Sequence, residues 1–274
     1  MAAALATPMA ALARAVVPRR VVSLNPCLDA ILVQVADRAQ ITALSHYSAD
    51  PSSTSIGALG RSFPITYETA EEIVALRPDL VLAAGYTEAA TRAALKRLNI
   101  RVEMFGVPST VEQSCRQIAR IADLVGHPER GSTLIARVNA ALAAAAPPMG
   151  APRLTALVFE SGGLVSAAGT LVDELLTRTG FTNAAGRYGL RQTGPLSLEQ
   201  LLADPPQVLL AGEPAPGAPT WADRGIHHPA LASVGPRMYR AAFPQHLTFC
   251  GGPVLIEAAA VLSRIRQNAM RARA

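Results

Sequence analysis

The side chains able to do chemistry in this chain do not form a recognised catalytic set. The sequence contains no GxGxxG after a strand, no phosphate-binding GxxxxGK[ST], no zinc motif HExxH and no nucleophile motif GxSxG. His227 and His228 are adjacent, so on any regular element they point in different directions and make a poor metal pair. We therefore predict a binding protein rather than an enzyme, with no catalytic residue and no resident metal.

Cysteine is the other reactive residue type, and several roles are open to its three copies. Cys27 begins a predicted helix, where a thiolate would be stabilised, but spacing fixes no histidine partner for it. It could be a nucleophile, a small buried residue, or a residue with a redox or ligand-contact role. The others are Cys115 and Cys250, and the absence of CxxC excludes zinc-ribbon and thioredoxin-like sites.

Composition indicates a folded chain without a nucleic-acid partner. Half of the 274 residues are apolar and 16% are charged, enough for one large core or two moderate ones. The formal charge is +5, but the basic residues are scattered apart from an arginine-rich end. Residues 1–19 are predicted to be a leader, because Ala13-Arg14-Ala15 is a small-x-small triplet of the kind signal peptidase cuts. The basic start of a signal peptide is missing, so a plain tail is the alternative.

Two stretches 128 residues apart have nearly the same pattern. Residues 71–83 and 199–211 both begin with glutamate, pass through a proline and end in an apolar run with alanine last. Each copy predicts a short helix, a proline stop and a buried parallel strand. One unit used twice predicts two lobes of similar structure, and ligands bind in clefts between lobes.

The segments around the two copies give the predicted domain organisation. Alternating strands and helices over 20–110 predict an N-terminal α/β lobe with a parallel sheet, and 148–274 predict a second lobe. Residues 111–147 repeat apolar side chains at helical spacing, with a kink expected at 126–129. A helical segment of about 34 residues would span roughly 50 Å, so we expect one long helix that joins the lobes.

Four segments in combination with this linker helix form a specific pattern. They are VVSLNP at 21–26, SHYSADP at 45–51, the first copy of the repeat at 71–82, and GTLVDEL at 169–175. Together they resemble the periplasmic substrate-binding proteins of ABC importers for vitamin B12, ferric siderophores and haem, over about residues 20–270. The resemblance implies two Rossmann-like lobes with parallel sheets joined by a single long α-helix, the class III periplasmic binding protein fold. It also implies a periplasmic location and transport rather than catalysis.

The resemblance gives the repeated glutamates a role. In that family one acidic residue on each lobe docks onto arginines of the two permease subunits, and Glu71 and Glu199 are the matching positions, with Glu72 able to replace Glu71. Both lie early in equivalent helices, where the helix dipole favours a carboxylate; an ordinary helix-start glutamate is the simpler alternative. We expect a monomer that contacts an ABC permease dimer in the inner membrane.

Ligand contacts are expected at the carboxyl ends of the strands, where parallel α/β lobes form sites. These ends include Asn25 and Tyr47, the latter at a ligand-contact position of the family. The remaining strand ends are Gly85-Tyr86 and the segments 160–163, 213–221 and 246–252.

Aromatic and imidazole side chains suggest the kind of ligand. Tyr86 and Trp221 are best placed to stack on a flat macrocycle, and His246, or alternatively His227, could bind a cobalt or iron centre of the ligand. The chain has one tryptophan and no arginine cluster suited to a carboxylate-rich siderophore. We therefore expect a metal-chelate ligand, specifically a corrinoid such as vitamin B12, with haem and ferric siderophores as alternatives.

Two other classes stay open from the sequence. One is a cytoplasmic two-lobed α/β enzyme with a metal or cysteine site; the other is a zinc or manganese binder, which five scattered histidines do not favour. Cys27 and Cys250 precede helices at the predicted cleft mouth, one on each lobe. We hypothesise that they approach each other across it; a Cα separation above about 7 Å would exclude a bridge.

Overall fold

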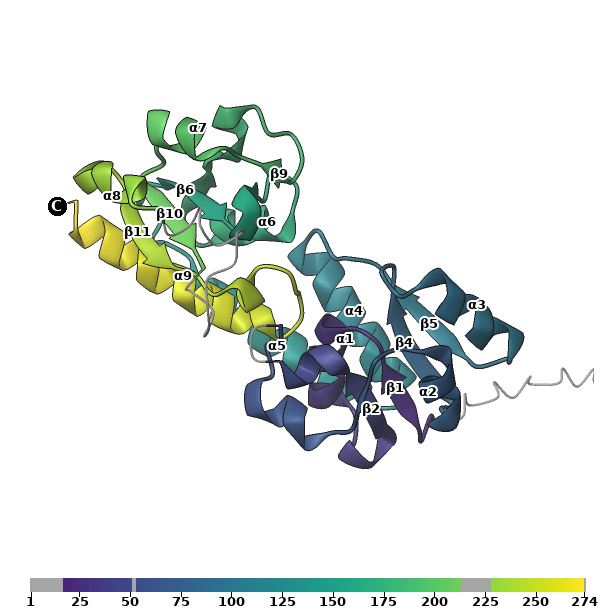
Figure 1. Cartoon of the computed structure of the whole chain (residues 1–274). Helices are drawn as coiled ribbons and strands as arrows, with labels where there is room; N and C mark the ends of the chain where they lie inside the picture. Colours follow the sequence, from purple (N-terminus) through teal and green to yellow (C-terminus); the bar gives the residue numbers. More distant parts are fainter. Residues whose placement is uncertain (1–16, 51–52, 213–227, 274) are drawn as a thin grey trace, which may run out of the picture.

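The computed structural model describes residues 17–50, 53–212 and 228–273, and these form two α/β lobes (Figure 1). The N-terminal lobe contains strands β1–β5 and the C-terminal lobe β6–β11. Residues 1–16, most of the expected leader, lie outside the described part. Over the described residues, no helix carries an apolar run that could span a bilayer.

The N-terminal sheet is entirely parallel, with the order β3-β2-β1-β4-β5. Its strands are β1 (Val21–Ser23), β2 (Ile41–Ser45), β3 (Ile65–Thr66), β4 (Leu80–Ala84) and β5 (Val102–Phe105). Its helices are α1 (Pro26–Val35), α2 (Ala70–Ala75) and α3 (Ala89–Arg97). In β4, Leu80 and Leu82 belong to the apolar cluster that contains α1, whereas Val81 and Ala83 pack with α2 and α3. Because both faces are covered, the strand is a continuous apolar run.

The C-terminal sheet repeats this plan with an antiparallel extension. Strands β8, β6, β10 and β11 lie side by side in parallel, while the short β7 and β9 run antiparallel beyond β6. The strands are β6 (Leu154–Phe159), β7 (Leu164–Val165), β8 (Phe181–Asn183), β9 (Gly194–Pro195), β10 (Val208–Ala211) and β11 (Tyr239–Ala242). The helices are α6 (Leu171–Arg178), α7 (Leu198–Ala203), α8 (Ala230–Ser233) and α9 (Val254–Arg271).

The two copies of the sequence repeat fold into the same unit. The first copy is α2 followed by β4, and the second is α7 followed by β10. In each lobe the repeat strand pairs with the first strand of the lobe on one side and with the last strand on the other. The prediction of two similar parallel α/β lobes is confirmed, with β7 and β9 as the departure.

The segment 111–147 contains two helices and not one continuous helix, which corrects our expectation. Helix α4 spans Val111–Leu124 and α5 spans Pro128–Ala145. Between them Gly126 adopts a φ of 83°. The amides of residues 126 and 127 donate to the carbonyls of residues 123 and 122, the Schellman arrangement that ends many helices. Pro128 then starts the next helix, since the missing N–H costs nothing at that position.

Helix α5 folds back along α4. Gly131 of α5 lies so close to α4 that an added Cβ would come within 2.5 Å of the Ala122 Cβ. The expected kink is therefore a full reversal, and the single helix between the lobes is α5, about 27 Å long. One linking helix between two parallel α/β lobes is the predicted class III fold.

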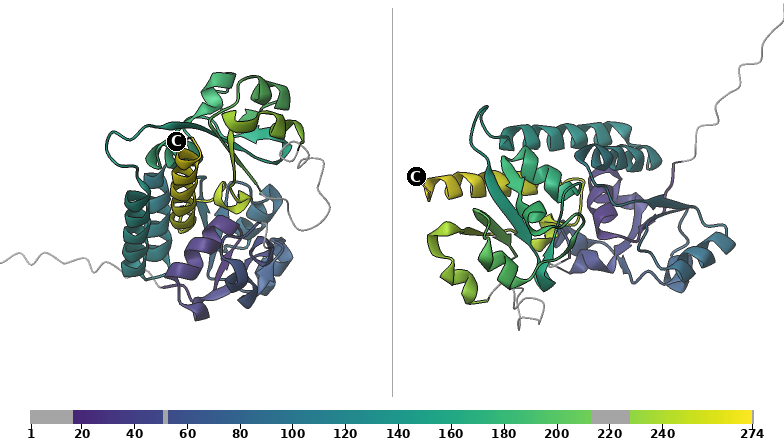
Figure 2. Two further views of the ribbon diagram at one scale, coloured as in Figure 1. Left: turned by 90° about the vertical axis from the view of Figure 1, so that its left-hand side faces the viewer. Right: turned by 90° about the horizontal axis from the view of Figure 1, so that it is seen from above.

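The lobes share one apolar layer, whose helices lie side by side in Figure 2. Helix α5 packs against α1 of the first lobe and against α9 of the second. A single buried cluster extends from Leu82 on β4 through Val138 on α5 to Leu262 on α9 and Leu210 on β10. The lobes therefore behave as halves of one body around a common core.

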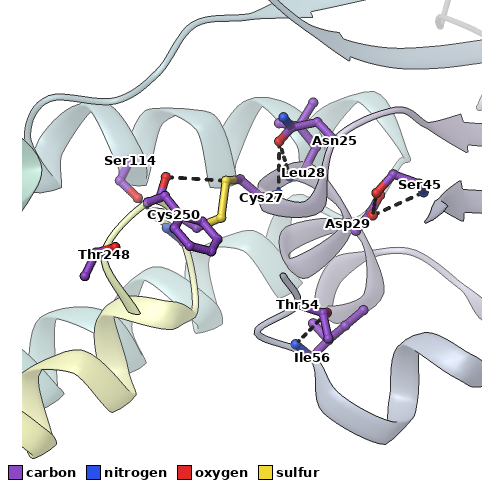
Figure 3. The surroundings of a disulfide bond; sticks show 12 residues. Asn25, Cys27, Leu28, Asp29, Ser45, Thr54, Ile56, Ser114, Thr248 and Cys250 are labelled. Atoms are coloured by element: carbon purple, nitrogen blue, oxygen red, sulfur yellow. Dashed lines mark hydrogen bonds between the residues drawn. A yellow bond between two sulfur atoms is a disulfide. The ribbon is translucent and has the colours of Figure 1, made fainter. Parts of the chain in front are cut away.

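A disulfide also crosses from lobe to lobe (Figure 3). It joins Cys27 at the start of α1 to Cys250 ahead of α9, with the Cα atoms 5.1 Å apart. Close by, the Gly252 amide donates a hydrogen bond of 2.6 Å to the Ser114 hydroxyl of α4. The hypothesis that Cys27 and Cys250 meet is confirmed, and a free nucleophilic thiol at Cys27 is excluded. Cys115 remains the free cysteine.

The bridge should contribute measurably to stability. We expect replacing both Cys27 and Cys250 by serine to lower the free energy of unfolding by about 2–5 kcal/mol, because the crosslink closes a chain of 223 residues. Urea unfolding would measure this, with Cys115→Ser as the matched single-thiol control. Oxidised protein should show one reactive thiol when denatured and three after reduction. Three thiols before reduction would contradict the bridge.

Candidate functional site

A cleft of about 510 Å³ lies between the two lobes. The N-terminal lobe lines it with Tyr86 and residues 107–109. The C-terminal lobe forms the opposite wall from several loops and the start of α6: Glu160, Ser166, Gly169, Thr170, Leu171, Val172, Thr193, Thr248 and Phe249. Its volume is in the range of small-molecule sites, roughly 300–1,000 Å³.

A smaller cavity of about 180 Å³ continues the cleft towards α1. The two cavities share Tyr86, Val107 and Phe249 in their walls. Asn25 and Cys27 line the smaller one, so the disulfide lies beside the cleft. The two cavities together form one site with contributions from both lobes.

The cleft forms where the strand order changes direction. In the first sheet, β1 lies between β2 and β4, so the chain leaves β1 towards one side and later returns on the other. Loops diverge at such a point, and ligands of open α/β sheets bind there. Asn25 follows β1 and Tyr86 follows β4; Glu160 follows β6, which has the corresponding place between β8 and β10.

Two aromatic side chains of the cleft are accessible. Tyr86 is 82% exposed and Phe249 is 40% exposed, and both lie in the walls of the two cavities. Val107, at 62%, adds an exposed aliphatic surface. Flat, accessible apolar groups on both lobes are suited to grip a large ring system from two sides.

The charge of the cleft is as distinctive as its shape. Among the described residues that line the two cavities there is no lysine, arginine or histidine, and Glu160 is the one ionisable acid. Burial raises the pKa of Glu160, and a hydrogen bond from the Thr248 hydroxyl partly offsets the effect. Serine and threonine hydroxyls supply most of the remaining polar surface.

Tyr47, expected to contact ligand, is not among the residues that line these cavities. It lies in a short 3-10 helix, His46–Ala49, directly after β2, and is 41% exposed. The His46 ring lies between Tyr47 and Tyr67, at centroid distances of 3.9 and 5.2 Å. The first lobe thus carries a separate aromatic cluster around His46.

A buried carboxylate holds this cluster in place. Asp29 of α1 is fully buried, and one of its oxygens accepts hydrogen bonds from the Ser45 amide and hydroxyl (Figure 3). The same oxygen accepts a hydrogen bond from the Ser48 hydroxyl. Its other oxygen is buried without a partner. Desolvation raises the pKa of Asp29 to about 7, so the folded state favours the protonated acid.

The other predicted ligand contacts lie elsewhere. His246 is partly buried in the short 3-10 helix Gln245–Leu247, 4.0 Å from Glu257 of α9, and does not line the described cavities. Trp221 and His227 lie outside the described residues. Within the described part of the chain, no three His, Cys, Asp or Glu side chains gather as a metal site.

The repeated glutamates occupy identical places in their helices. Glu71 and Glu199 are each the second helical residue after a capping hydroxyl, Thr69 or Ser197, and both are exposed. Hydrogen bonds from the helix start and from Ser197 lower the pKa of Glu199. Glu72 is engaged differently, because it accepts hydrogen bonds from the Thr66 hydroxyl and the residue 67 amide. Of the neighbours Glu71 and Glu72, Glu71 is therefore the one whose carboxylate is available for contact with another protein.

Comparison with known families now identifies the chain. The periplasmic binding protein family matches residues 21–235, most of its length. This chain belongs to the periplasmic binding protein family. Proteins of this family bind solutes and are not enzymes, so the enzyme hypothesis falls.

Known relatives and solved structures are similar to this chain at low sequence identity. A cobalamin-binding protein of Halobacterium salinarum is 24% identical over 199 residues, which are 71% of this chain and 54% of the relative. The chain thus spans about half the length of the curated relatives it matches. The periplasmic haem-binding protein RhuT of Roseiflexus superposes with a TM-score of 0.72 at 24% identity, covering 92% of this chain and 98% of that one. The periplasmic vitamin B12 binding protein BtuF of Vibrio cholerae has a TM-score of 0.67 at 18% identity, covering 93% and 98%.

Several lining residues were not singled out from the sequence. Phe249 and Glu160 lie within strand-end segments that the sequence analysis named as a whole, and Thr170 lies in the segment that carries the family resemblance. Val107 follows β5, a strand end that the analysis passed over. The strand-end rule locates such residues, but it does not tell which of them face the cleft.

Stability should depend on pH through Asp29. Its pKa is raised from 3.8 to about 7, so the protonated acid stabilises the fold at low pH and this contribution is lost as the pH rises through 7. Between about pH 5.5 and pH 8 we expect a loss of about 2 kcal/mol from this group. Asp29→Asn should reduce the dependence of the free energy of unfolding on pH. Burial also raises the pKa of Glu68 to about 7, so this group should contribute to the same dependence, and Glu68→Gln is the companion variant. An unchanged pH slope in Asp29→Asn would refute the assignment.

Proposed function

We propose that this chain is the substrate-binding component of an ABC importer and carries a corrinoid in the cleft between its lobes. The observation that carries the choice of ligand is the lining of the cleft: accessible aromatic and aliphatic surface, hydroxyl groups and no cationic residue among those described. A corrinoid is a large ring whose edge bears uncharged carboxamides. Such an edge is matched by hydroxyls and a hydrogen-bond-accepting carboxylate, and the ring by Tyr86 and Phe249.

Haem and ferric siderophores are the alternative ligands. The names of the relatives include both haem-binding and cobalamin-binding proteins, so the fold alone does not choose between them. Haem carries two carboxylates, and many siderophore complexes are anionic. Arginine and lysine side chains bind such anionic groups, and the described lining offers neither; the start of α6 is the one anion-binding feature of the described walls. This difference favours the corrinoid.

Delivery would use the exposed glutamates. Glu71 and Glu199 occupy equivalent positions on equivalent helices, so a single pair of basic sites on a two-fold symmetric permease could receive both. The disulfide supports a periplasmic location, since such bonds persist in oxidising compartments. We propose a monomer that docks with one lobe on each permease subunit.

The ligand proposal predicts saturable one-to-one binding of cyanocobalamin by the purified protein. Tyr86→Ala should weaken this binding by about tenfold or more, because it removes an aromatic contact from the cleft wall. Leu98→Ala is the matched control, since Leu98 is 56% exposed at the end of α3 and does not line the cleft. Calorimetric titration of the wild type and both variants with cyanocobalamin, haem and ferric siderophores would measure these affinities. Binding of an iron chelate alone would overturn the choice of ligand but keep the transport role.

The docking proposal predicts that binding and transport separate. Replacing Glu71 and Glu199 together by alanine should leave ligand affinity unchanged and reduce uptake by about tenfold or more, since paired interfacial charges are lost. Glu112→Ala is the control, because Glu112 is also an exposed helix-start glutamate but lies on α4, outside the repeat. Uptake by cells or by vesicles with the reconstituted permease provides the measurement. Full uptake by the double variant would contradict docking through these residues.

A further inference from the structure

Asn25 and Glu160 occupy the same position in the two lobes. Strand β1 pairs with β4 so that Val21 lies opposite Leu80, and β6 pairs with β10 so that Ala156 lies opposite Val208. Leu80 and Val208 are equivalent residues of the sequence repeat. Asn25 lies four residues after Val21, and Glu160 lies four residues after Ala156. Both line the cleft. The two lobes thus present one polar side chain each from the end of their first strand.

These two side chains differ in what they are free to do. The Asn25 side-chain oxygen caps α1, accepting hydrogen bonds from the Cys27 amide at 2.9 Å and the Leu28 amide at 3.3 Å. No α-helix follows Glu160; the chain makes a short 3-10 turn whose first amides the carboxylate does not cap. The Glu160 main chain is satisfied by hydrogen bonds with residues 163 and 164. Its carboxylate is therefore left to the cleft.

The immediate neighbours of Glu160 cannot fully satisfy it. Its hydrogen-bonding neighbour is the Thr248 hydroxyl, which also donates to the Gln245 carbonyl at 2.8 Å. A hydroxyl has one proton, so the Gln245 carbonyl and the Glu160 carboxylate compete for that of Thr248, and the carboxylate keeps acceptor capacity for a ligand. The Thr170 hydroxyl, across the same wall, likewise donates to the Ala167 carbonyl at 2.9 Å. The Glu160 carboxylate and the oxygen atoms of these hydroxyls thus present acceptors to the cleft, beside the first amides of α6.

An acceptor-rich wall without a described cation discriminates between ligand substituents. A carboxamide or amine can donate to Glu160, whereas a carboxylate at the same place would meet like charge in a partly desolvated site. We propose that Glu160 is the specificity-determining residue of the cleft, which selects chelates with carboxamide or other donor groups and rejects those with carboxylates. This inference rests on the proposed function and adds the chemical rule by which that function is achieved.

The test compares ligands that differ in one group. Cyanocobalamin and its monocarboxylic acid derivatives, in which one ring carboxamide is replaced by a carboxylate, are titrated into the wild type and into Glu160→Gln. We expect the wild type to prefer the amide by about tenfold or more over at least one derivative. In Glu160→Gln the ratio of the two affinities should fall towards one, because the side-chain amide of glutamine can donate a hydrogen bond to a ligand carboxylate. Glu129→Gln, which removes one exposed negative charge at the start of α5, beyond the end of α4 that is remote from the cleft, should keep the wild-type preference.

The outcomes separate the two proposals. If cyanocobalamin binds but the amide preference is absent from the wild type, or is the same in Glu160→Gln, the role of Glu160 is overturned while the ligand proposal stands. If Glu160→Gln loses affinity for all forms equally, Glu160 supports the fold of the wall and not its selectivity. If no corrinoid binds to any variant, the proposed function fails and the selectivity rule fails with it. A far-ultraviolet circular dichroism spectrum like that of the wild type establishes that each variant is folded.

Discussion

The apolar layer formed by α1, α4, α5 and α9 determines how this molecule works. Each sheet needs its inner face covered, and both sheets use this same layer, so one continuous cluster extends from the strands of one lobe to those of the other. Separating the lobes would expose part of this cluster to water at roughly 25 cal/mol per Å². The cleft is therefore a preformed gap between two halves of a common core.

Duplication explains why the functional features occur in pairs. The same helix–proline–strand unit places an exposed glutamate on each lobe, and the first strand of each lobe, which pairs with the strand of that unit, is followed by a polar residue. The lobes then diverge where function requires it. Asn25 is used to start α1, and α1 is part of the shared layer, so its side-chain oxygen serves the fold. Glu160 is followed by a turn and stays available, which makes the two walls of the cleft chemically unlike.

Sequence reasoning reached the class of fold because that class depends on local patterns used twice. The repeat, the buried strand at 80–84 and the proline stops all act over a few residues. The reversal at Gly126 also had its local signals, a glycine followed by Pro128, but these fit a kink as well as a turn. The choice is made by packing, since the missing side chain of Gly131 lets α5 lie against Ala122. Such a contact joins residues whose proximity no periodicity reveals.

The candidate site was less predictable than the fold, because it also depends on contacts between residues far apart in the sequence. Strand ends could be named from the sequence, and Asn25 and Tyr86 do line the cleft, whereas Tyr47 lies with His46 in a separate cluster held by Asp29. Which loop faces the other lobe depends on how the lobes are joined. Here the joints are the Cys27–Cys250 bridge, the hydrogen bond from Gly252 to Ser114, and that from the Val111 amide to the Glu174 carboxylate at 2.7 Å. All three connect the lobes across the shared layer, so large hinge motion is restrained at that side. Among the described residues, selectivity is then expected from those that already line the gap.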